Sequence, residues 1–259
     1  MSEYIEARLL AGKVMLVTGI ANDQSIAWGC AKAFHEMGAR LAVTYRNAHD
    51  QPAVEALAAQ VGALCLPLDV TVPEQMSAVF ERLRSEFGVL HSVLHAIAFA
   101  PRADLHGPLS QCSREGFVKA MDCSCYSFIE MARLAVPLMT EGGTLFTMSY
   151  HGAHRVVEHY NVMGPVKAAL EASVRYLAHE LGHLGIRVHA ISPGPIRTRA
   201  ASGLADFDEL IEDATRRAPA GAIAGIEDVG YATAMLAVDN ARLITGSTLY
   251  VDGGAHIMN

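Results

Sequence analysis

Hydrophobic residues along this chain fall into two alternating patterns. Short runs rich in Val, Ile, Leu and Thr recur from end to end, and several are apolar at every position rather than at every second one. Unbroken apolar runs of this length are typical of strands that helices cover on both faces. The candidate strands are 13–19, 40–45, 63–70, 92–98, 143–149, 186–192 and 247–253.

Longer segments with apolar residues at helical spacing separate these strands. Examples run over 25–38, 73–88 and 164–182, and Gly38, Gly88 and Gly185 stand where such helices should stop. Alternating strands and helices predict right-handed crossovers and one doubly wound parallel sheet. We therefore expect an α/β fold of the Rossmann type over residues 1–259, as a single domain with about seven strands and helices on both faces.

Composition fits a globular protein of the cytoplasm. The chain is 51% hydrophobic and 18% charged, so it can bury a large core. Its five cysteines are scattered in apolar context, which favours reduced thiols over a disulfide framework. The start, MSEYIEARLL, does not read as a secretion signal, and no apolar run approaches the roughly 20 residues of a membrane span. A net charge of -7 argues against nucleic-acid binding.

The first candidate strand leads into a loop, TGIANDQSIAWG, that is suited to a dinucleotide. Gly19 permits a tight turn, and Ser25 and Gly29 mark the start of the next helix. Amides at that helix N-terminus could hold a pyrophosphate. The spacing is not the GxGxxG fingerprint, so a glycine-relieved turn without a ligand is the alternative interpretation.

The ends of the second and third strands offer contacts for adenosine. Arg46 follows the second strand, where an acid would favour NAD and an arginine can accept a 2′-phosphate. Arg46 could equally stack on the adenine of NADH, so NADH and NADPH both remain open as cofactors. Asp69 and Val70, at the end of the third strand, could cap the adenine edge.

A tyrosine and a lysine supply the candidate chemistry. Tyr160 and Lys167 are seven residues apart, close to two turns of helix, so we expect them on one helical face with backbones roughly 10 Å apart. A cation beside a phenol favours an ionised or strongly hydrogen-bonding oxygen, which suits a developing oxyanion. Tyr150 lies ten residues before Tyr160. Such spacing also arises by chance.

A zinc-peptidase motif is also present. His179, Glu180 and His183 match H-E-x-x-H, and His189 follows ten residues after the first histidine. The extended metal motif needs glycine where Ile186 stands, and His189 falls inside a strand candidate. We therefore expect no metal site.

Taken together, these segments resemble the short-chain dehydrogenase/reductase superfamily, and more closely its enoyl-acyl-carrier-protein reductases of bacterial fatty-acid synthesis. In typical superfamily members a tyrosine lies four residues before the lysine and a serine about seventeen before it. Met163 and Tyr150 hold those places here, which counts against an ordinary carbonyl reductase. The resemblance rests on 18–29, 95–101, 149–178, 190–203, 226–230 and 250–254.

The resemblance implies reduction of the 2,3 double bond of a 2-enoyl thioester by NADH or NADPH. Tyr160 would hydrogen-bond the enolate oxyanion, Lys167 would hold the nicotinamide ribose, and Tyr150 would line the substrate pocket and assist. It also implies a homotetramer and a small helical lid over about 197–212.

The expected binding residues form two sets. The cofactor set is Gly19, Ile20, Ser25, Ile26, Arg46, Asp69, Val70, Ile97, Lys167, Ile196 and Thr198. The substrate set is Ala100, Leu105, Tyr150, Tyr160, Met163, Ala201 and Phe207, where small and apolar side chains suit a fatty chain.

The lid departs from the family pattern in charge. Family members carry basic residues there that receive acidic acyl carrier protein, but Ala205, Asp208 and Glu209 hold those places here. Acid facing an acidic partner is repulsive, so acyl carrier protein is a possible rather than a secure partner. A substitute patch could come from Arg199, Arg216 and Arg217.

Changes near the expected site leave other functions open. Ala98 replaces a glycine of typical relatives and could narrow the nicotinamide pocket. His151, His154 and His159 are either solvated loop residues or titratable neighbours of the pocket. The alternatives are a paralogous reductase with another enoyl or carbonyl substrate, and a non-catalytic nucleotide-binding module on the same fold.

Overall fold

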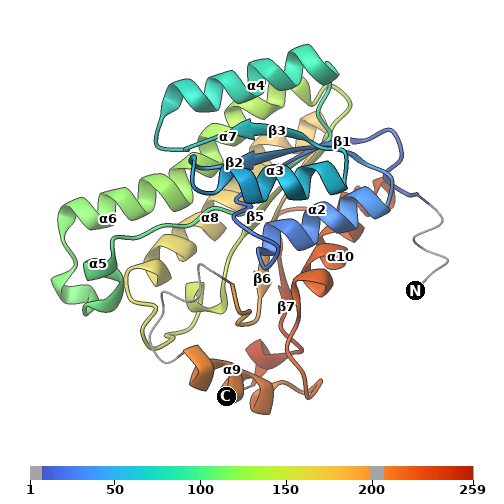
Figure 1. Ribbon diagram of the computed structural model, residues 1–259. Helices are drawn as coiled ribbons and strands as arrows, with labels where there is room; N and C mark the ends of the chain where they lie inside the picture. The colour runs from blue at the N-terminus through green and yellow to red at the C-terminus, as the bar shows by residue number, and fades with distance from the viewer. Residues whose placement is uncertain (1–7, 199–206, 259) are drawn as a thin grey trace.

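Seven parallel strands form one sheet in the order β3-β2-β1-β4-β5-β6-β7 (Figure 1). The computed structural model describes residues 8–198 and 207–258. The predicted doubly wound parallel sheet is confirmed, because the strand order runs outward in both directions from β1 and β4. The strands are β1 (Val14–Thr18), β2 (Arg40–Tyr45), β3 (Leu64–Pro67), β4 (Ser92–His95), β5 (Gly143–Met148), β6 (Ile186–Pro193) and β7 (Thr248–Val251).

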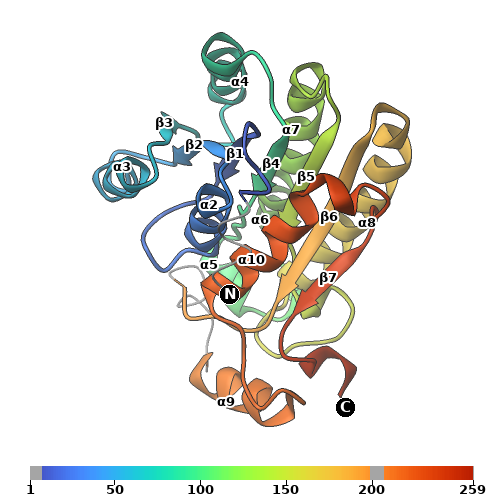
Figure 2. The same cartoon turned by 90° about the vertical axis from the view of Figure 1, so that its right-hand side faces the viewer.

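Helices cover both faces of this sheet, as the continuously apolar strands predict (Figures 1 and 2). One face packs against α2, α3 and α10, and the other against α4, α7 and α8, with a separate apolar core on each side. The main helices are α2 (Ile26–Glu36), α3 (Gln51–Gln60), α4 (Pro73–Phe87), α5 (Arg102–His106), α6 (Arg114–Met121), α7 (Ser127–Ala135), α8 (Met163–Leu181), α9 (Phe207–Arg217) and α10 (Ile226–Ala237). A π-helical segment, Asp122–Tyr126, joins α6 to α7.

Two strands end earlier than their apolar runs suggest. β3 ends at Pro67 rather than at residue 70, because Asp69 starts a turn in which its carboxylate accepts from the Thr71 amide at 3.0 Å. β4 ends at His95 rather than at residue 98. Beyond it, the Phe99 backbone exchanges hydrogen bonds with the Ser124 hydroxyl, at 2.9 and 3.1 Å, instead of with a neighbouring strand.

Helices α2 and α10 cross at closest range through two glycines. A Cβ built on Gly29 would lie 2.2 Å from the Ile226 carbonyl oxygen, and one built on Gly230 would lie 2.3 Å from the Gly29 carbonyl oxygen. Neither position can hold a side chain without separating the backbones. The helix that follows the first loop is therefore locked to the helix that follows the lid region.

Parallel strands bring their carboxyl ends to one edge of the sheet, and α9 lies beyond that edge (Figures 1 and 2). The loops after β1, β2, β4, β5 and β6 all open there, as in other doubly wound sheets that bind ligands at this edge. The expected lid at 197–212 falls partly outside the described residues, and its helical part runs on to Arg217. The predicted helix stops at Gly38, Gly88 and Gly185 are confirmed, with φ of 97°, 74° and 72°.

Candidate active site

The loop after β1 is shaped for close approach of a ligand to its backbone. Gly19 has φ of 91°, and a Cβ there would lie 2.1 Å from the Ala96 carbonyl oxygen. Ser25 Oγ accepts from the amides of Ala21 and Asn22 at 3.0 and 3.1 Å, which holds the loop in one conformation before α2 begins. This rigid glycine turn at a helix N-terminus fits the pyrophosphate of a dinucleotide.

Arg46 and Asp69 meet at the adenosine end of this edge. Arg46 Nε lies 3.3 Å from Asp69 Oδ2, and its guanidinium lies 5.6 Å from the centre of the Phe99 ring. Lys119 Nζ lies 5.5 Å from the same ring centre. Partial burial opposes ionisation of Asp69, but hydrogen bonds from Thr71 and Arg46 outweigh it and lower the pKa of this carboxyl. Two cations, Arg46 and Lys119, therefore lie close to the Phe99 ring, and one of them is paired with Asp69.

Tyr160 does not lie on the helix that carries Lys167, so the expectation of one helical face is wrong. Helix α8 begins at Met163, and Tyr160 belongs to the turn before it. The residues on either side of Tyr160 prevent a helix: His159 has φ of 62° and Asn161 φ of 38°. Asn161 Nδ2 donates to the Leu105 carbonyl at 2.7 Å, which ties this turn to α5.

The Tyr160 ring is enclosed by backbone and by a second tyrosine. A Cβ on Gly152 would lie 2.4 Å from Tyr160 Cδ1, so the ring packs directly on the backbone there. Tyr150 meets it edge to face, with ring centres 4.9 Å apart. Burial, together with the nearby Tyr150 and Glu171, raises the pKa of Tyr160 far above its usual value of 10.0. Tyr160 is therefore a neutral phenol that can donate a hydrogen bond.

Lys167 is a buried cation on α8, at 4% exposure. Its ammonium donates to the Met148 carbonyl at the end of β5 at 2.6 Å. Burial lowers the pKa of Lys167 to about 8, although neighbouring groups, Glu171 among them, oppose the change. The bond to Met148 uses one of the three N–H donors of this ammonium.

Three of the expected substrate residues belong to the same large apolar cluster as Tyr160. Met163, the first residue of α8, is buried in this cluster, and Ala100 and Leu105 pack against it, as does Ile97 of the cofactor set. Burial raises the pKa of Tyr150 to about 12, although nearby Arg217 opposes it. Ala201 lies outside the described residues, and Phe207 is the first residue of α9. Of the substrate set, the structure therefore shows Ala100, Leu105 and Met163 in the same apolar cluster as Tyr160.

The remaining cofactor-set residues border the same edge. Ile20 is buried, and Ile26 and Ile196 pack on the same core cluster as it does. Val70 is buried in the turn after β3, and Thr198 is the last residue described before the gap. Their apolar contacts position the loops, which is compatible with the predicted roles.

The residues that depart from the family pattern differ in their exposure and in their charged partners. On α9, Asp208 and Glu209 are exposed, and Asp208 pairs with Arg197. Arg216 and Arg217 both pair with Asp213, so one carboxylate only partly offsets the charge of these two arginines of the expected basic patch. Ala205 and Arg199 lie outside the described residues, and Ala98 is exposed.

The three loop histidines differ from one another. His154 is an exposed loop residue whose Nε2 also lies 2.5 Å from the carboxylate of the buried Glu171. His151 is half-buried, and burial lowers its pKa although Asp252 opposes this. His159 is exposed in the turn before Tyr160.

Buried polar residues beneath the site were missed in the sequence. His95 bonds Thr147 Oγ1 at 3.0 Å and Ser127 Oγ at 2.8 Å. Burial, with Lys167 nearby, lowers the pKa of His95 to about 3. Glu171 stands four residues after Lys167, and a charged residue at this spacing on an otherwise apolar helix face is the signal that could have found it.

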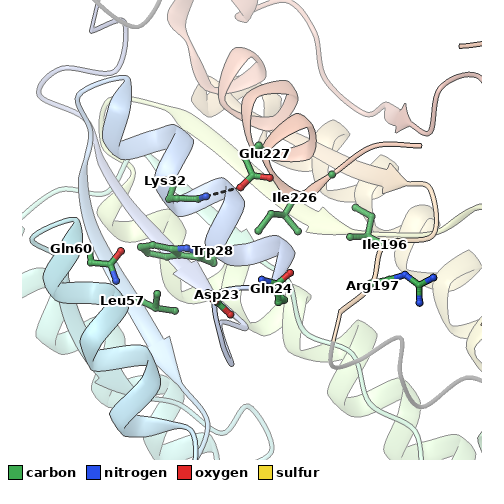
Figure 3. A pocket seen from close by; sticks show the side chains of 11 residues that line it. Asp23, Gln24, Trp28, Lys32, Leu57, Gln60, Ile196, Arg197, Ile226 and Glu227 are labelled. Atoms are coloured by element: carbon green, nitrogen blue, oxygen red, sulfur yellow. Dashed lines mark hydrogen bonds and ion pairs between the residues drawn. The ribbon is translucent and has the colours of Figure 1, made fainter. Parts of the chain in front are cut away.

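A surface hollow of about 570 Å³ adjoins the cofactor loop but holds none of the catalytic candidates (Figure 3). It opens between α2, α3 and the start of α10, and Lys32 spans it to reach Glu227 at 2.7 Å. Asp23, Gln24 and Ile196 connect it to the predicted pyrophosphate loop. This hollow is therefore an extension of the cofactor edge away from the tyrosines.

The zinc-like motif is accounted for by ordinary structure. His183 Nδ1 contacts the Glu180 carbonyl oxygen at 2.9 Å, and His189 is buried in β6, with Nε2 bonded to the Ile244 carbonyl at 2.9 Å. Over residues 8–198 and 207–258, no group of three or more His, Cys, Asp or Glu side chains is arranged to hold a metal. Over the same residues, no helix is both long and apolar enough for a bilayer.

Comparison with known proteins gives one consistent family. The family model described as "Enoyl-(Acyl carrier protein) reductase" matches residues 19–256. An enoyl-[acyl-carrier-protein] reductase [NADH] of Bacillus cereus is 46% identical over 253 residues, covering 96% of this chain and 99% of that protein. The corresponding protein of a Nostoc species is 47% identical over 253 residues, covering 96% and 98%.

Solved structures agree. The Bacillus cereus enoyl-acyl carrier protein reductase with NADP+ and indole naphthyridinone has a TM-score of 0.95 and 46% identity, covering 97% of this chain and 99% of that one. The Anaplasma phagocytophilum reductase in complex with NAD has a TM-score of 0.92 and 43% identity, covering 97% and 94%. The resemblance read from the sequence is confirmed: this chain belongs to the enoyl-acyl-carrier-protein reductase family of short-chain dehydrogenases/reductases.

Proposed function

We propose that this protein reduces the 2,3 double bond of a 2-enoyl thioester with NADH or NADPH, in fatty-acid synthesis. The observation that carries the proposal is the neutral, partly buried Tyr160 phenol packed against the apolar core cluster, on a chain of this family. A reduced nicotinamide, when bound, supplies the hydride that saturates the β-carbon.

The chain's own groups would stabilise the charge that develops on the substrate. Tyr160 would donate its phenolic hydrogen bond to the thioester oxygen as that oxygen becomes an enolate. Tyr150, edge to face with Tyr160 at 4.9 Å between ring centres, would orient that phenol and close the water-facing side. Lys167 would hold the ribose hydroxyls with the two N–H bonds that Met148 does not take.

The test is a substrate panel with purified protein. Oxidation of NADH and NADPH would be followed by absorbance with crotonyl-CoA, a longer 2-enoyl-CoA and the same acyl groups on acyl carrier protein. Turnover of any of these enoyl chains supports the proposal. Tight cofactor binding without turnover of any thioester would instead favour a non-catalytic nucleotide-binding module.

The identity of the thioester carrier depends on α9. We propose that acyl carrier protein docks more weakly here than on a basic surface, because Asp208 and Glu209 are exposed on α9. A paralogous reductase with a carrier-free substrate is the second candidate, and the same acidic face favours it. A kcat/KM for CoA-linked chains equal to or above that for carrier-linked chains would support it.

We further propose a homotetramer that works in the cytoplasm. Large apolar side chains are exposed along α6 and α7 and near the chain's end, which is the usual character of a subunit interface. They are Phe117, Val118, Tyr126, Ile129, Leu243, Ile257 and Met258. The five cysteines are all free, as a reducing compartment requires. Light scattering after gel filtration tests the assembly; a monomer at micromolar concentration would contradict it.

A further inference from the structure

A buried carboxylate lies one helical turn beyond Lys167. Glu171 is 1% exposed, and three donors from two separate segments, the turn after β5 and the start of β7, converge on it. Ser149 Oγ donates to Oε1 at 2.5 Å, His154 Nε2 contacts Oε2 at 2.5 Å, and Thr248 Oγ1 donates to Oε2 at 3.2 Å. A buried carboxylate is tolerated only when donors such as these satisfy it.

The residues bonded by Lys167 and Glu171 lie directly before Tyr150 in the chain. Lys167 and Glu171 are four residues apart on α8, and they hydrogen-bond two consecutive residues, Met148 at the end of β5 and Ser149 directly after it. The next residue is Tyr150. Two successive turns of α8 therefore fix the backbone directly before Tyr150.

His154 fixes the same segment from its other side. It closes the short helical turn His151–Ala153, whose central glycine, Gly152, packs on the Tyr160 ring. Half of the His154 side chain is exposed, so the ring reaches inward from the surface to the carboxylate. The turn between the two tyrosines is thus fastened at both of its ends to one side chain on α8.

We propose that Glu171 and His154 form a positioning pair that holds the 149–154 turn against α8 and so sets Tyr150 and Tyr160 for catalysis. The proposal rests on the proposed enoyl reduction. Neither residue touches the reacting atoms, and both act through the two phenols. Without the pair the turn is no longer held in place, so the two phenols stabilise the transition state less well. The cofactor site after β1 and β2 is unaffected.

The experiment is steady-state kinetics of the full-length enzyme with His154→Ala, His154→Gln and Glu171→Gln. For His154→Ala we expect kcat to fall roughly tenfold or more, since small misplacement of a catalytic group is costly. KM for NADH should stay within about twofold, because cofactor binding is not involved. His154→Gln keeps a donor at the position of Nε2 and should recover most of the activity. Arg155→Ala, the exposed neighbour, is the matched control.

A double-mutant cycle separates positioning from mere stability. If the two residues act as a unit, His154→Ala combined with Glu171→Gln should lose less kcat than the product of the single losses. An unchanged kcat in His154→Ala would overturn the proposal. So would a loss of kcat that is explained by a lower melting temperature and is not restored in His154→Gln. A wild-type protein without enoyl reductase activity would instead refute the proposed function.

Discussion

Tyr150 and Tyr160 meet edge to face, with ring centres 4.9 Å apart and planes at 62°. The two rings come from different segments, one directly after β5 and one just before α8. Burial raises the pKa of both phenols, so both keep their protons at neutral pH. The site consequently offers neutral hydrogen-bond donors rather than a phenolate.

Replacing Tyr160 by Phe removes that donor but keeps the ring on Gly152. We expect kcat to fall on the order of a hundredfold to a thousandfold, the range for losing one preorganised oxyanion donor. KM for NADH should be unchanged, and Tyr150→Phe should have the smaller effect. Stopped-flow oxidation of NADH with an enoyl-CoA measures both variants. Equal rates for wild type and Tyr160→Phe would remove Tyr160 from the reaction.

Nucleotide affinity should depend on pH through Lys167. Its pKa is lowered from 10.5 to about 8, so the side chain is charged below about pH 8 and neutral above it. We expect NADH to bind more weakly as pH rises through 8, because the neutral amine has lost its charge and one donor. Fluorescence titration between about pH 6.5 and 9.5 measures this. Lys167→Arg stays charged throughout, so a pH-dependent loss that persists in this variant would point to another group.

Arg46 should discriminate between the two nucleotides. Its side chain is 57% exposed, pairs with Asp69 and lies over Phe99. We expect Arg46→Ala to raise KM for NADPH roughly tenfold while KM for NADH changes little, since a charge-assisted bond to a 2′-phosphate contributes about 1.5 to 3 kcal/mol. Lys119→Ala should show the same direction with a smaller effect. Equal changes with both nucleotides would indicate stacking on adenine instead.

Acid should destabilise the fold through His95. The unfolded side chain takes up a proton near pH 6.5, whereas burial delays this to about pH 3 in the folded protein. The stability present above pH 6.5 is therefore lost as pH falls towards 3, at about 1.4 kcal/mol per pH unit. Melting temperatures at pH 7 and 5 should differ less for His95→Gln than for wild type. His179→Gln, on the exposed end of α8, should behave like wild type.

The pattern of apolar residues was sufficient to predict the sheet but not the arrangement of the site. Buried parallel strands and their helices leave apolar runs, so all seven strands could be predicted, with errors only where Asp69 and Phe99 leave the sheet through side-chain hydrogen bonds. The Tyr160 turn was misread because spacing alone cannot reveal positive φ at His159 and Asn161. The role of Glu171 could not be predicted, because the donors that it binds lie 17 to 77 residues away in the chain.

The close crossing of α2 and α10 prevents these two helices from moving independently of each other. With Gly29 and Gly230 in backbone contact, the helices can neither slide nor tilt by a methyl's width independently. The nucleotide loop begins α2, and the chain reaches α10 directly from α9. Any displacement of α9 relative to α10 would therefore have to be absorbed within residues 218–225, because α10 is held against α2.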